Sequence, residues 1–138
     1  MAMFNTLTQA VVSLAVSAAV ASTPIDYGSA IGRDQAIALG EQYIKRDLLD
    51  PYSAHIEWPF TVVPFTEKLP LSKRISGYAT CVSVNAKNAY GGYTGVKFAR
   101  IVFRDDKVID YLPVSELRIV PDVCKELQKT FGMTPVGL

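Results

Sequence analysis

The sequence predicts an α+β fold: an antiparallel four-stranded sheet with an N-terminal and a C-terminal helix packed on one face. Apolar residues recur at helical spacing from residue 33 and again from residue 123, whereas the stretch between them has the composition and alternation of β-strands. The connections between the last three predicted strands have hairpin length, which favours antiparallel pairing. One helix, several strands and one helix in this order are typical of α+β folds.

The first helix is predicted from Arg33 to Leu49, because its apolar residues recur every three or four positions: Ala36, Ile37, Gly40, Tyr43, Ile44 and Leu48. Asp34 lies in the first turn, where a negative charge suits the helix dipole. Asp50-Pro51 ends the helix, because a residue before proline avoids the α conformation.

Four strands are expected next. The first, Ile56–Phe65, contains Pro59 and Pro64, which lack a backbone donor and so place it at a sheet edge or divide it into two short pieces. The other three are expected at Ser76–Asn85, Tyr93–Arg104 and Lys107–Leu112, with a tight Asp105-Asp106 turn before the last.

The last helix is expected to begin with Pro121 and to end before Gly132, with an apolar stripe of Val123, Cys124, Leu127 and Phe131. One face of the Ser76–Asn85 strand carries only small side chains, on which a helix can lie closely: Gly77, Ala79, Cys81 and Ser83. If the last helix covers this face, Cys81 and Cys124 meet and form a disulfide in an oxidising compartment. The alternative is two buried thiols in a reducing compartment.

The chain has 138 residues, which suits a single domain, predicted at residues 32–138 after a linker at residues 22–31. Residues 1–21 are interpreted as a signal peptide. No residue before Asp26 is charged, and the apolar stretch Ala10–Ala21 is too short to cross a bilayer and ends in an A-x-A-like cleavage site. An uncleaved anchor or an interfacial helix is the alternative, because no Lys or Arg precedes the apolar stretch.

Composition excludes several functions. A net charge of +1 gives no indication of nucleic-acid binding, and two cysteines with one histidine are too few for most metal sites. We therefore expect no cofactor and no metal. A catalytic role is not expected either, since no nucleophile has an activating context. A small hydrolase would have to use His55, with Glu57 on the same strand face.

Residues 84–95, VNAKNAYGGYTG, form the most distinctive motif. Asn85 and Asn88 tolerate turn conformations, and Gly91 and Gly92 are expected to supply positive φ angles. This motif is interpreted either as a turn alone or as a turn that also contacts a partner. The candidate binding residues are Asn85, Lys87, Asn88, Tyr90, Tyr93 and Arg100.

The same motif, taken with the upstream Leu49–Ala54 segment LDPYSA, resembles a family of small, poorly characterised exported proteins of Gram-negative bacteria. They carry a similar "DP-x-S-A" pattern followed by "VNAKN-x-x-GGY-x-G". The resemblance extends over residues 32–103 and implies an envelope-facing module without catalytic residues.

Charge is unevenly distributed along the chain. Seven basic residues and no acidic residue lie between Lys68 and Arg104. They could form a positive surface, or flanking carboxylates could neutralise them.

We expect an exported binding module of the periplasm or cell envelope. Its expected partner is an envelope protein or an anionic surface, either lipid headgroups or glycan, so contact with the membrane is possible. An alternative is an anchored structural subunit of an envelope assembly, and the exposed side of the first helix (Glu41, Lys45) is the next candidate surface.

Overall fold

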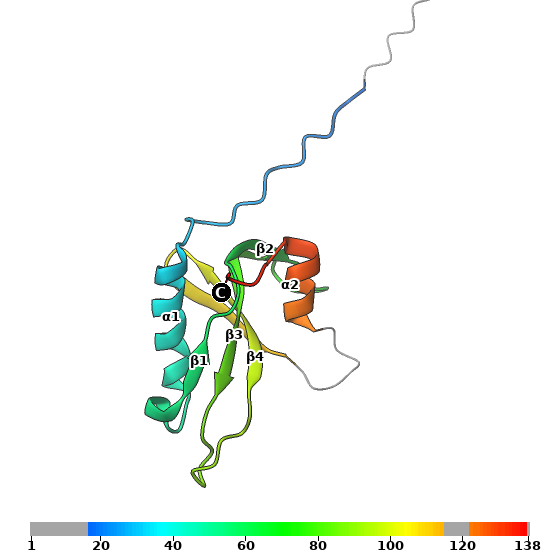
Figure 1. Cartoon of the computed structure of the whole chain (residues 1–138). Coiled ribbons are helices and arrows are strands. Elements are labelled where there is room, and N and C mark those ends of the chain that lie inside the picture. Colours follow the sequence, from blue (N-terminus) through cyan, green and yellow to red (C-terminus); the bar gives the residue numbers. More distant parts are fainter. Residues whose placement is uncertain (1–16, 115–121, 138) are drawn as a thin grey trace, which may run out of the picture.

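The computed structural model describes residues 17–114 and 122–137. The α+β fold class and the antiparallel sheet are confirmed (Figure 1). The elements are, in chain order, α1 (Arg33–Arg46), the short 3-10 helix η1 (Pro51–Ser53), β1 (His55–Glu57), β2 (Val63–Glu67), β3 (Ile75–Asn85), β4 (Lys97–Arg104), β5 (Lys107–Pro113) and α2 (Val123–Phe131). Most of the expected signal peptide, and Pro121, lie outside the described residues.

The sheet has five strands rather than four, because the proline-containing segment forms two short strands, as one of its alternatives predicted. β1 pairs with the end of β3, from His55↔Asn85 to Glu57↔Ser83. β2 pairs with the beginning of β3, up to Glu67↔Ile75. Together they complete one edge of the sheet, while β4 and β5 follow on the other side of β3.

The two helices lie on opposite faces of the sheet, so the expectation that both cover one face is wrong (Figure 1). α1 packs on the face that carries Val82, Ile101 and Phe103. α2 packs on the other face, against Cys81 and Val102 among others. The physical reason is the composition of β4: five consecutive residues, 99–103, are buried, and a strand that is buried on both faces needs a cover on both.

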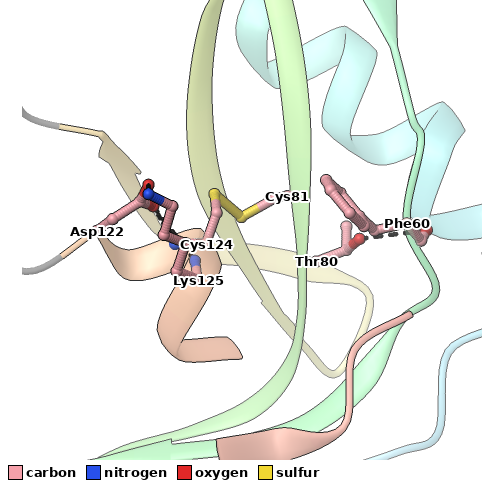
Figure 2. Close-up of a disulfide and its surroundings, with 6 residues drawn as sticks. All are labelled: Phe60, Thr80, Cys81, Asp122, Cys124 and Lys125. Atoms are coloured by element: carbon pink, nitrogen blue, oxygen red, sulfur yellow. Dashed lines mark hydrogen bonds and ion pairs between the residues drawn. A yellow bond between two sulfur atoms is a disulfide. The ribbon is translucent and has the colours of Figure 1, made fainter. Parts of the chain in front are cut away.

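The predicted disulfide joins Cys81 of β3 to Cys124 of α2, with their Cα atoms 5.9 Å apart (Figure 2). The small side chains of β3 do face α2, as expected. Asp122 caps this helix, accepting hydrogen bonds from the backbone N–H groups of Cys124 (3.0 Å) and Lys125 (3.2 Å). Gly132 ends it in the left-handed conformation (φ 73°).

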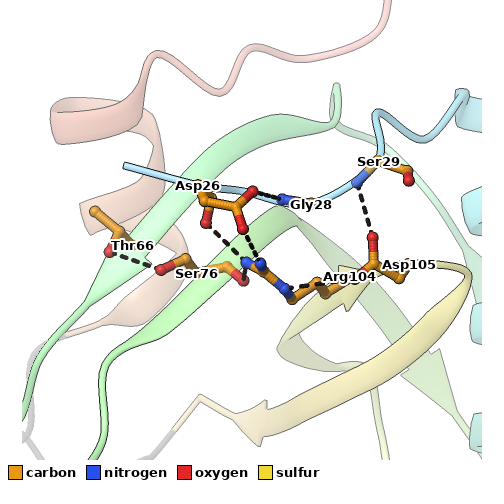
Figure 3. A network of polar contacts seen from close by, with 7 residues as sticks. All are labelled: Asp26, Gly28, Ser29, Thr66, Ser76, Arg104 and Asp105. Carbon is orange, nitrogen blue, oxygen red and sulfur yellow. Dashed lines mark hydrogen bonds and ion pairs between the residues drawn. The ribbon is translucent and has the colours of Figure 1, made fainter. Parts of the chain in front are cut away.

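The N-terminal segment, expected to be a linker, is partly fixed to the domain (Figure 3). Arg104 binds the carboxylate of Asp26 and also donates to the backbone oxygen of Ser76, at 3.1 Å. The Ser29 N–H donates to Asp105 at 2.9 Å. The pKa of the Asp26 carboxyl is lowered, mostly by the hydrogen bond from the Gly28 N–H and next by Arg104. The chain therefore enters the domain beside the start of β3 and the end of β4.

Candidate functional site

The two motifs that the sequence singled out, at residues 49–54 and 84–95, meet at one end of the sheet. Asn85, the last residue of β3, pairs with His55. The hydroxyl of Tyr93 donates to the carbonyl of Ser53 at 2.9 Å. We call this end of the molecule, residues 49–55 and 85–96, the tip. It lies at the far end of β3 from the point where the N-terminal segment enters (Figure 1).

Side-chain amides shape the tip. Asn88 Oδ1 accepts from the backbone N–H groups of Tyr90 (2.9 Å) and Gly92 (3.2 Å), and Asn85 Oδ1 accepts from Gly95 N–H (3.2 Å). Both asparagines thus bond nearby backbone groups, as the sequence suggests. The glycine expectation is half wrong: Gly91 (φ 79°) has a positive φ, whereas Gly92 does not and Gly95 (φ 93°) does. The chain leaves this turn through irregular backbone, so β4 begins at Lys97 instead of Tyr93.

The tip exposes aromatic and aliphatic side chains from both motifs. Tyr52 is fully exposed (100%), Tyr90 almost so (96%), and Tyr93 about half (46%). Leu49 and Val96, also in the tip, are exposed as well. Tyr93 is nevertheless held in place by its hydrogen bond to the Ser53 carbonyl. The centre of its ring lies 5.3 Å from the centre of the His55 ring and 5.4 Å from the ammonium group of Lys87. The tip therefore combines exposed rings with a fixed backbone.

His55 acts as a structural donor in this arrangement. Its Nε2 lies 3.1 Å from the Tyr93 hydroxyl, whose own hydrogen is donated to Ser53. His55 Nε2 must therefore carry the hydrogen that joins the two side chains. The nearby Ser53 hydroxyl donates to the Asp50 carbonyl at 3.2 Å rather than to His55. No hydrogen bond within the described part of the chain joins Glu57 to His55, so the two side chains that a small hydrolase would use as an acid–base pair are not connected there.

Arg100 lies away from the tip surface. It is 3% exposed and binds Glu67 (3.1 Å) and Asp110 (3.0 Å), which reach it from β2 and β5. Its guanidinium carbon lies 4.6 Å from the ring centre of Phe65. The structure therefore brings together Asn85, Lys87, Asn88, Tyr90 and Tyr93 but not Arg100.

The basic stretch between Lys68 and Arg104 is partly neutralised by its flanks, one of the two interpretations given above. Arg100 and Arg104 are paired with carboxylates from the segments before and after the stretch. At the tip, Lys87 helps to lower the pKa of Asp50, after the larger effect of the Ser53 side chain. The tip itself carries one cation, Lys87, and one carboxylate, Asp50.

Sequence reasoning missed a hollow between the last turn of α1 and the η1 part of the tip. Tyr52 forms one of the walls of this hollow. The sequence did contain a signal for Tyr52, because a tyrosine directly after Asp-Pro falls in the turn that ends a helix.

In the described ranges no helix is both long and apolar enough to span a membrane, and no cluster of three His, Cys, Asp or Glu residues could hold a metal.

Comparisons with protein-family models, with curated proteins and with solved structures found no match for this chain.

Proposed function

We propose that the protein is an exported, non-catalytic binding module of the periplasm or cell envelope, and that the tip is its contact surface. The observation that carries this proposal is the fixed display of exposed tyrosines by two separate loops. Tyrosine offers a rigid, amphipathic contact surface at low entropic cost, and glycine and asparagine around it are typical of binding loops on a rigid scaffold. A partner would meet a preformed surface.

Two observations support export. A disulfide between Cys81 and Cys124 is typical of an oxidising compartment outside the cytoplasm. The uncharged N-terminal segment with its apolar stretch at Ala10–Ala21 has the pattern of a signal peptide. The resemblance to exported proteins of Gram-negative bacteria agrees with both.

The first prediction concerns processing. Protein recovered from a Gram-negative host is expected to begin near Ser22, and N-terminal sequencing measures this directly. An intact Met1 in the membrane fraction would instead favour the anchored structural subunit. The chain enters the domain at the end opposite to the tip (Figure 1).

The second prediction tests the contact surface. A photo-crosslinking residue at position 90 is expected to trap an envelope component in cells, because Tyr90 is almost fully exposed on the tip. The matched control is the same residue at position 107, since Lys107 is exposed at the other end of the sheet. Equal trapping of the same component from both positions would show that the tip is not the contact surface.

A further inference from the structure

The loop that joins β2 to β3 exposes two leucines. We call residues 68–74, KLPLSKR, the leucine loop, and all seven of them are exposed. Leu71 has the most exposed large apolar side chain in the described ranges (109%), and Leu69 is about half exposed (53%). The loop leads into β3 at Ile75, whereas the tip begins where β3 ends, at Asn85. The leucine loop and the tip therefore lie at opposite ends of β3.

A tight turn holds Leu71 in a backbone conformation that leucine rarely adopts. The Ser72 N–H donates to the Leu69 carbonyl at 3.3 Å, which closes a turn with Pro70 and Leu71 at its centre. The Ser72 hydroxyl donates to the same carbonyl at 3.1 Å. Leu71 has a φ of 62°, and a turn with proline first and a positive φ second normally has glycine or asparagine at the second position.

This strained leucine brings no gain within the fold. Its side chain is fully exposed, so it adds nothing to either hydrophobic core. Glycine or asparagine would form the same turn with less strain. Backbone strain of this kind clusters at functional sites. We therefore expect the side chain of Leu71 to contact something outside the chain.

The leucine loop also carries positive charge without compensation. Three of its seven residues are cations, Lys68, Lys73 and Arg74, and none is acidic. None of the three forms an ion pair with a carboxylate of the described residues. Arg74 donates instead to the hydroxyl of Thr66, at 3.1 Å. An anionic surface would therefore meet three unpaired cations around one protruding leucine.

The carboxylates at this end of the sheet have other partners. Glu67, directly before the loop, binds the buried Arg100 at 3.1 Å. Asp26 and Asp105 both bind Arg104. Their charges are thus matched by arginines outside the loop, and the cations of the loop remain for an external ligand.

From these observations we propose that the leucine loop docks the protein onto a bilayer that contains anionic phospholipids. Leu71 enters the acyl-chain region, while the three cations lie among the headgroup phosphates. Burial of apolar area and attraction to anionic lipid both strengthen such binding. A fluid lipid layer can close around a single protruding side chain, whereas a folded protein would need a matching pocket. This surface goes beyond the tip, and the two can be tested separately.

The first test asks whether Leu71 enters the bilayer. It uses protein recovered from the envelope of a Gram-negative host, and vesicles of phosphatidylcholine and phosphatidylglycerol in equal parts. Trp58, the single tryptophan, is buried, so Leu71→Trp adds one exposed reporter. Vesicles are expected to shift its fluorescence to shorter wavelength, and lipids with brominated acyl chains to quench it. Leu112→Trp is the matched control, because Leu112 is exposed on β5, outside the loop and the tip, and no shift is expected there.

Leu71→Asn separates docking from folding. Asparagine accepts a positive φ and lacks the apolar side chain. Vesicle binding, measured by co-sedimentation, is expected to weaken about tenfold. The unfolding temperature should stay the same or rise, because the turn is relieved of strain. A leucine that served the fold would give the opposite result, namely a lower unfolding temperature with unchanged binding.

The charges are tested in the same assay. Lys73→Gln is expected to weaken binding about fivefold at low salt, and added salt should weaken the binding of the wild type. Lys125→Gln, which removes an exposed charge from the first turn of α2, is the control and should bind as the wild type does.

Three results would overturn the proposal: no fluorescence shift for Leu71→Trp, equal losses for Lys73→Gln and Lys125→Gln, or equally tight binding to vesicles of phosphatidylcholine alone. A crosslinker at position 71 that trapped an envelope protein, in the absence of vesicle binding, would make the loop a protein-binding surface instead. Crosslinking from residue 90 is independent of all these measurements, so the tip and the leucine loop stand or fall separately.

Discussion

Replacing Cys81 and Cys124 together by alanine is expected to lower the free energy of unfolding by about 2–5 kcal/mol. The bond joins residues 43 positions apart, so its loss frees a long loop in the unfolded chain. The double substitution also removes the covalent attachment of α2, a helix of nine residues, to β3. A helix this short has little stability by itself and depends on its packing against the sheet. Chemical denaturation followed by circular dichroism measures the change.

Reduction of the wild-type protein is the matched control, because it opens the disulfide without changing any side chain. Reduced wild type is expected to unfold at a lower denaturant concentration than the oxidised protein, and close to the double variant. If the double variant unfolded at the same denaturant concentration as the oxidised wild type, the bond would contribute no stability. Neither cysteine belongs to the tip. The crosslinking pattern from residue 90 should therefore persist under conditions in which the double variant remains folded.

Local patterns predicted most of the fold because each acts over a few residues. Asp105-Asp106 forms the expected tight turn, with both residues at positive φ (48° and 62°), a conformation that aspartate tolerates better than most residues. The row of small residues on β3 located the partner helix and hence the disulfide. The faces covered by the two helices could not be read in this way, because alternation shows which residues are buried but not which helix covers them.

The residues of the tip were partly predictable for the same reason. Asn88 and Gly91 shape a local turn, and a local motif reveals such residues. The contacts of Tyr93 with Ser53 and His55 span about 40 positions in the chain and depend on strand register. No signal in one sequence gives that register across a proline-interrupted edge. The burial of Arg100 depends in the same way on carboxylates from two other strands.

Arg100→Gln is therefore expected to destabilise the fold and not merely to weaken binding, in contrast to a surface residue. Removing the guanidinium group leaves Glu67 and Asp110 facing each other across the sheet without their shared cation. Breaking a buried ion pair costs about 3–5 kcal/mol. Because both carboxylates are about a quarter exposed, we expect a smaller loss of roughly 2–3 kcal/mol. Thermal and urea unfolding measure it.

Lys87→Gln is the matched control for Arg100→Gln. It removes one positive charge from the same basic stretch, but Lys87 lies at the tip, where its ammonium group lies over the ring of Tyr93 and, after the larger effect of the Ser53 side chain, lowers the pKa of Asp50 slightly. Its free energy of unfolding should change by less than about 0.5 kcal/mol, as for most surface substitutions. Equal stability of the two variants would contradict the buried role of Arg100. Because loss of Arg100 affects the whole fold, a binding defect in its variant carries no information about the contact surface, and the tip has to be tested through Tyr52, Lys87 and Tyr90.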